Sequence, residues 1–102
     1  MDVRRGERGE TVVEIGGVFD TKAAARLAGW LAEVPQGEPL VLDFTRARRC
    51  EDLMLARIAD RLAGRGGLVV RGLGRHQERL LRYFGVVIER SPAFMEGQDA
   101  VG

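Results

Sequence analysis

Histidine, cysteine and lysine each occur only once in the 102 residues of this chain, as His76, Cys50 and Lys22. A single histidine excludes a serine–histidine–aspartate relay and a two-histidine metal site within one chain. A single cysteine cannot form an intrachain disulfide, which fits a reducing compartment. We therefore predict a protein that is not an enzyme, with no catalytic residues, no metal ligands and no cofactor.

Long apolar runs are also missing. No run approaches the roughly 20 residues that span a bilayer, and residues 1–8 lack the apolar centre of a signal peptide. We expect a cytoplasmic protein without membrane insertion. The length allows one domain, which we place over residues 1–102. We expect its core to cover about residues 11–90, and residues 91–102 to form a short terminal helix or a frayed tail.

The chain has almost no excess of charge of either sign, because 16 basic and 15 acidic side chains leave a formal net charge of +1. Residues 46–90 nevertheless carry 11 basic and 5 acidic side chains. A binder of nucleic acid or another polyanion is therefore an alternative. Its candidate residues would be Arg46, Arg48, Arg49, Arg75, Arg79 and Arg82. The six aromatic residues do not alternate with these arginines as single-strand binding requires, so nucleic acid is the weaker hypothesis.

Apolar periodicity predicts an alternation of strands and helices. We expect strands at 3–5, 11–15, 40–44, 68–70 and 86–88, and helices at 21–34, 52–63 and 75–84. Asp20 is expected to cap the first helix, and Val34 to lie on its apolar face. In the third helix, Leu80, Leu81 and Phe84 are expected to face inward. The order predicts an α/β fold with a mixed, mostly parallel sheet of four to five strands. Three to four helices should pack mainly on one face of that sheet.

The second helix has a clear apolar side and an unusual outer side. Its inward positions recur at helical spacing and are Leu55, Ile58, Ala59 and Leu62. The residues predicted to point outward are Leu53, Arg57, Asp60 and Arg61. Met54 either joins Leu53 as an exposed apolar pair or packs beneath a loop. Partners of open α/β sheets bind at the carboxyl ends of strands, and this helix follows such an end.

An exposed apolar residue among arginines is typical of an interaction surface. The candidate partner-binding residues are Arg49, Glu51, Asp52, Leu53, Met54, Arg57 and Arg61.

Several short motifs in residues 12–85 resemble, in order and spacing, those of a STAS domain. This is the fold of bacterial anti-sigma factor antagonists and of the cytoplasmic tails of sulfate transporters. The motifs are Gly17-Val18-Phe19-Asp20, Leu42-Asp43-Phe44-Thr45, Gly66-Gly67-Leu68-Val69-Val70 and Leu80-Leu81-Arg82-Tyr83-Phe84-Gly85. The resemblance implies a single STAS-like domain.

One motif departs from the family. The family's D-S-[ST]-G sequence falls on Glu51-Asp52-Leu53-Met54, so Leu53 takes the position of the phosphorylated serine or threonine. A leucine cannot accept phosphate. Asp52 acts either as a fixed mimic of the phosphate charge or only as a helix cap.

The resemblance implies a non-enzymatic protein-interaction module similar to an anti-sigma factor antagonist. It would dock a partner through the loop and helix after the central strand, without serine or threonine phosphorylation. The partner would be a kinase-like anti-sigma factor, a transporter subunit or another STAS protein, and a homodimer is a further candidate. An accessory subunit of a transporter is an alternative function. A nucleotide-binding enzyme is disfavoured because no phosphate-binding loop is complete.

Overall fold

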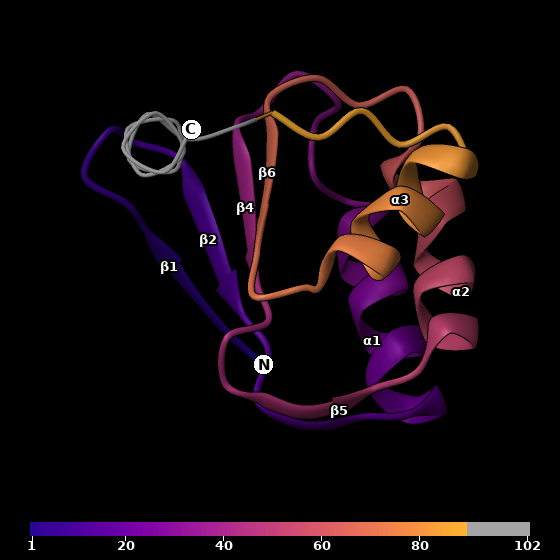
Figure 1. Cartoon of the computed structure of the whole chain (residues 1–102). Helices are drawn as coiled ribbons and strands as arrows, with labels where there is room; N and C mark the ends of the chain where they lie inside the picture. The colour runs from indigo at the N-terminus through magenta and orange to yellow at the C-terminus, as the bar shows by residue number, and fades with distance from the viewer. Residues whose placement is uncertain (90–102) are drawn as a thin grey trace, which may run out of the picture.

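The structure, a computed structural model, describes residues 1–89. The predicted terminal helix or tail at 91–102 lies outside the described residues. Four strands form the main sheet in the order β1-β2-β4-β6 (Figure 1). They are β1 (Asp2–Arg5), β2 (Thr11–Glu14), β4 (Leu40–Asp43) and β6 (Leu68–Arg71). β1 is antiparallel to β2, and the other neighbours are parallel. The prediction of a mixed, mostly parallel sheet is confirmed.

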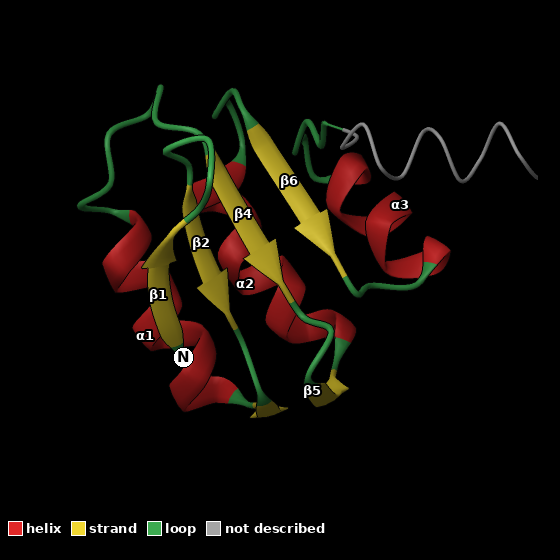
Figure 2. Ribbon diagram, turned by 90° about the vertical axis from the view of Figure 1, so that its left-hand side faces the viewer, coloured by secondary structure: helices red, strands yellow, loops and turns green. Residues whose placement is uncertain are grey.

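Three helices cover one face of this sheet, as Figures 1 and 2 show from two directions. They are α1 (Thr21–Leu31), α2 (Asp52–Leu62) and α3 (Arg75–Tyr83). Alternate strand residues such as Val13 and Leu42 point toward the helices and are fully buried. They pack in one cluster with helix residues such as Leu27 and Leu55. Burial of these aliphatic side chains stabilises the layered arrangement.

A second, two-stranded sheet was not predicted. β3 (Gly17–Phe19) and β5 (Ala47–Cys50) pair in parallel beyond the carboxyl ends of β2 and β4. In Figure 2 they lie at the lower end of the molecule, where α1 and α2 begin. Arg48 and Arg49 are exposed, so the sequence of β5 lacks the apolar character expected of a strand.

Helix α1 ends three residues earlier than predicted, at Leu31. The guanidinium group of Arg65 donates hydrogen bonds to the carbonyl oxygens of Pro35 (2.8 Å), Val34 (2.9 Å) and Leu31 (3.4 Å). These bonds hold the chain in a turn, so Val34 is half-buried there and does not extend the helical face.

The end of α3 also differs from the prediction. The helix ends at Tyr83, and Phe84 is 42% exposed, so its predicted inward orientation is wrong. The reason is that the chain leaves the helix at Phe84 and turns at Gly85, whose φ is +92°. Residues 86–88 form no strand, and only Glu89 bridges to Val69 of β6.

Gly72 fixes the turn between β6 and α3. Its φ is +86°, and a Cβ atom there would meet the carbonyl carbon of Phe44 at 2.6 Å and the amide nitrogen of Thr45. Only glycine combines this left-handed conformation with so close a backbone approach. The turn therefore packs directly against the end of β4.

Among the described helices, none is long and apolar enough to cross a membrane.

Candidate partner-binding surface

The start of α2 is the centre of the predicted site. Glu51 holds the N-cap position, and within residues 1–89 its side chain bonds to no amide of the helix. Asp52 is the first helical residue. Of the two roles considered for Asp52, that of helix cap is therefore wrong. Its negative charge still lies in the first turn, where the helix dipole stabilises it.

Asp52 is instead bound to α3. Oδ2 of Asp52 lies 2.9 Å from Nε2 of His76, and both side chains are more than half exposed. Nearby, Nε2 of Gln77 donates a 2.7 Å hydrogen bond to the carbonyl oxygen of Cys50. These two contacts tie the start of α3 to the start of α2. Neither could be inferred from the sequence, because nothing in it signals that His76 and Gln77 face residues more than 20 positions away.

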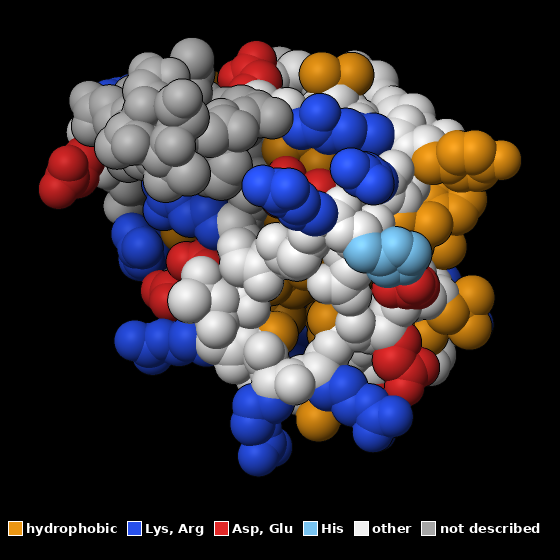
Figure 3. Space-filling model, viewed as in Figure 1, with side chains coloured by type: hydrophobic (Ala, Val, Ile, Leu, Met, Phe, Trp, Pro, Cys, Tyr) orange, Lys and Arg blue, Asp and Glu red, His pale blue; other side chains and the backbone are white. Residues whose placement is uncertain are grey.

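The two helices run side by side in the same direction. At the far ends of the two helices, a Cβ atom added to Gly85 would lie 4.0 Å from the Cβ atom of Ala63. The exposed rings of Tyr83 and Phe84 therefore lie at the opposite end of α2 from Leu53. Their centroids are 5.8 Å apart in an edge-to-face arrangement. In Figure 3, hydrophobic side chains reach the surface along the right-hand edge, over α2 and α3.

The outward direction predicted for α2 is confirmed for the residues named. Leu53 is 63% exposed, and the exposed polar residues are Arg57, Asp60 and Arg61. Leu53 and Arg57 are four residues apart and are neighbours on the helix surface.

Met54 does not belong to that outer face. It is 5% exposed and belongs to the same buried cluster as Phe19. The expectation of an exposed Leu53–Met54 pair is therefore wrong, and the alternative in which Met54 packs inward is observed. The physical reason is that one residue turns the helix by about 100°, which carries Met54 from the solvent side toward α1 and β3.

Arg49 and Glu51 flank the start of α2. Nη2 of Arg49 lies 3.4 Å from Oε1 of Glu51, with both side chains exposed. Such an exposed ion pair contributes little to stability, because solvent screens it. Both side chains are therefore free to be rearranged by a partner at low cost.

Cys50 is a half-buried free thiol. Burial, and then the nearby Asp52 carboxylate, raise the pKa of Cys50 from 9.0 to about 11. The thiolate is the nucleophilic form, so both causes disfavour covalent catalysis by Cys50. Within the described residues, no three His, Cys, Asp or Glu side chains are grouped to hold a metal ion.

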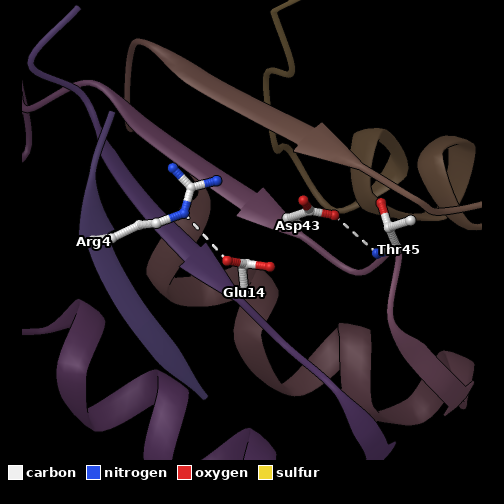
Figure 4. A network of polar contacts seen from close by, with 4 residues as sticks. All are labelled: Arg4, Glu14, Asp43 and Thr45. Carbon is white, nitrogen blue, oxygen red and sulfur yellow. Dashed lines mark hydrogen bonds and ion pairs between the residues drawn. The ribbon is translucent and has the colours of Figure 1, made fainter. Parts of the chain in front are cut away.

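A polar network lies on the sheet face opposite the three described helices (Figure 4). Nε of Arg4 donates to Glu14 at 3.2 Å, and Oδ1 of Asp43 accepts from the Thr45 amide at 2.9 Å. Burial acts to raise the pKa of Asp43, but the hydrogen bonds from Thr45 and the charges of Arg71 and Arg4 outweigh it. The pKa of Asp43 is therefore lowered. Asp43 thus stabilises the turn after β4 and is not part of the α2 surface.

Comparison with known proteins agrees with this architecture. The family model described as "Mlab, STAS domain" matches residues 3–88. A search of curated proteins found no match. The family match covers the four-stranded sheet, the two-stranded sheet and all three helices. The chain therefore belongs to the STAS domain family, whose members are in general non-enzymatic interaction modules of the kind found in anti-sigma factor antagonists.

Proposed function

We propose that this protein binds a protein partner through α2 and the β5 segment before it, without control by serine or threonine phosphorylation at that helix. The observation that supports the proposal is the 63% exposure of Leu53 in the first turn of α2. The STAS motif places the phosphorylated residue of family antagonists at this position. A large apolar side chain here gives a partner a contact that phosphate cannot modify.

The surroundings of Leu53 suit a protein interface. Burial of an exposed leucine contributes about 1.5–3 kcal/mol, enough for a central contact. Arg57 follows it one turn later and Arg61 a further turn along, both exposed. Arginine is enriched in interfaces because its stem packs against apolar groups while its guanidinium group pairs with carboxylates. The surface therefore favours a partner that presents an apolar contact and acidic residues along α2.

The charge at the start of α2 is permanent. Asp52 supplies a carboxylate next to Leu53 in the sequence, and this carboxylate contacts His76. A kinase would find no hydroxyl at position 53, so the partner would be bound constitutively. The candidate partners are a kinase-like anti-sigma factor, a transporter subunit or another STAS protein.

The test uses the tagged full chain to capture its partner from an extract of the cells that make it. Leu53→Asp places a charge in the proposed contact, and Arg57→Glu reverses the charge beside it. We expect each to reduce capture by about 10-fold or more, since loss of a central contact costs at least 1–2 kcal/mol.

Two variants of similar exposure control for non-specific effects. Val87 lies in the segment after α3 and is 65% exposed, so Val87→Asp matches Leu53→Asp. Arg26 is exposed on α1, so Arg26→Glu matches Arg57→Glu. Unchanged capture by both α2 variants would show that this surface is not the docking face. Capture that depended on the phosphorylation state of the chain, read from its intact mass, would contradict constitutive binding.

A further inference from the structure

A hollow of about 130 Å³ opens beside the start of α2. Phe19 of β3 and Met54 of α2 line it, and both belong to the buried core. Val18 lines it as well and is 49% exposed. The interior is thus apolar, and it lies beside the first turn of α2, in which Leu53 is exposed.

The remaining lining residues are polar and come from three elements. Asp20 caps α1 and Thr21 is its first residue, Arg49 belongs to β5, and Glu51 is the N-cap of α2. Arg49 and Glu51 neutralise one another as an ion pair, which leaves the Asp20 carboxylate as the net charge among the lining residues.

The size of the hollow suits one side chain. An apolar cavity of about 150 Å³ accepts a benzene molecule, so a hollow of similar volume accepts an aliphatic or aromatic side chain. Filling it would also cover Val18 and bring a partner against Leu53. A deep apolar pocket with exposed apolar residues around it is the usual location of an interface hot spot.

We propose that this hollow receives an apolar side chain of a protein partner and that the partner carries a lysine or arginine next to that side chain. The proposal rests on docking at α2 and extends the contact to Val18 and Thr21, outside the surface assigned above. The basic neighbour follows from the net negative charge that Asp20 gives the lining residues, because a positive charge at the rim complements it.

The charge order along α2 gives the partner a direction. Carboxylates lie at the start of the helix, and Arg57 and Arg61 lie one and two turns later. A complementary segment is therefore basic at the hollow and acidic toward the end of α2. Helices commonly begin with acidic residues and end with basic ones, so a partner helix laid antiparallel to α2 satisfies both ends.

The experiment selects displayed random peptides on the immobilised full chain. Peptides of about 12 residues are about 18 Å long as helices, enough to span α2. We expect selected sequences to share an apolar residue next to lysine or arginine, with acidic residues one or two turns earlier in the peptide. Affinities are then measured on four variants, one of which is the Leu53→Asp chain described above.

Thr21→Trp fills the hollow from its rim, and we expect it to weaken binding by about 30-fold or more. Lys22→Trp is the matched control, since Lys22 is the exposed next residue and does not line the hollow. Glu51→Gln leaves the Arg49 charge without its ion-pair partner and so cancels the net negative charge of the lining residues. We expect a loss of about 2- to 5-fold that disappears in high salt.

The proposal is overturned if no peptide is enriched, if the enriched peptides place acidic residues beside the apolar one, or if Thr21→Trp binds them as tightly as Lys22→Trp does. Peptides lost on Leu53→Asp but retained on Thr21→Trp would leave the α2 surface intact as a docking face and remove only the hollow.

Discussion

At the scale of single residues, Arg65 shows how a buried cation is accommodated by carbonyl oxygens, with no carboxylate partner among residues 1–89. Its side chain is 2% exposed, and its guanidinium group meets three carbonyl oxygens at the end of α1. The last carbonyls of a helix carry partial negative charge, so they partly compensate the buried positive charge. Within the described chain, Nε of Arg65 has no hydrogen-bond partner.

We expect Arg65→Met to lower the free energy of unfolding by about 2–4 kcal/mol, because it leaves these carbonyl oxygens without donors in a partly buried turn. Urea denaturation monitored by circular dichroism measures the change. Arg61→Met is the control, since Arg61 is exposed and its replacement should change stability by less than about 0.5 kcal/mol. Equal losses in the two variants would contradict the role assigned to Arg65.

At the scale of elements, the two helices that border the hollow begin differently. Oδ1 of Asp20 accepts a 2.9 Å hydrogen bond from the Ala23 amide and so caps α1, as predicted. Glu51 occupies the same position at α2, but among residues 1–89 it accepts no such bond. The free amides at the start of α2 remain accessible to solvent or to a partner.

Asp20→Ala should therefore cost about 1 kcal/mol of stability, the usual value for a lost N-cap bond. Glu51→Ala should cost only a few tenths of a kcal/mol, because no capping bond is lost. Chemical denaturation of both variants, compared with the native chain, provides the measurement. A loss for Glu51→Ala as large as that for Asp20→Ala would mean that Glu51 caps α2 in solution.

The sequence was sufficient to predict the strands of the main sheet and the three helices, because their apolar residues recur with clear periods. It was insufficient for β5, whose Arg48 and Arg49 are typical of a loop and which forms a strand only by pairing with β3. The role of Arg65 depends on a contact about 30 residues away and has no local signal.

The candidate site was partly predictable for the same reason. Helical spacing correctly placed Leu53, Arg57 and Arg61 outside. The hollow depends on Phe19 and Thr21, which a tertiary contact brings to the start of α2.

At the scale of the whole molecule, one cluster of buried side chains joins the main sheet to all three helices. Trp30 of α1 packs against this cluster. No described element has a core of its own, so loss of any one element exposes the common core. This arrangement is expected to unfold cooperatively.

We therefore expect residues 1–102 to unfold in a single transition. Fluorescence of Trp30, the only tryptophan, reports on α1, and far-ultraviolet circular dichroism reports on all secondary structure. Their urea midpoints should coincide within experimental error. Two separate midpoints would indicate more than one folding unit.

The turn at Gly72 has a consequence for how this sequence can change over generations. Alanine is the smallest substitution available, yet its methyl group would already collide with the backbone of Phe44 and Thr45. Relief of that collision would displace the start of α3 and, with it, the contacts of His76 and Gln77 to the segment around α2. Gly72 lies outside the proposed docking surface. Substitution of Gly72 is nevertheless constrained, because it would disturb the contacts that hold α3 against the start of α2.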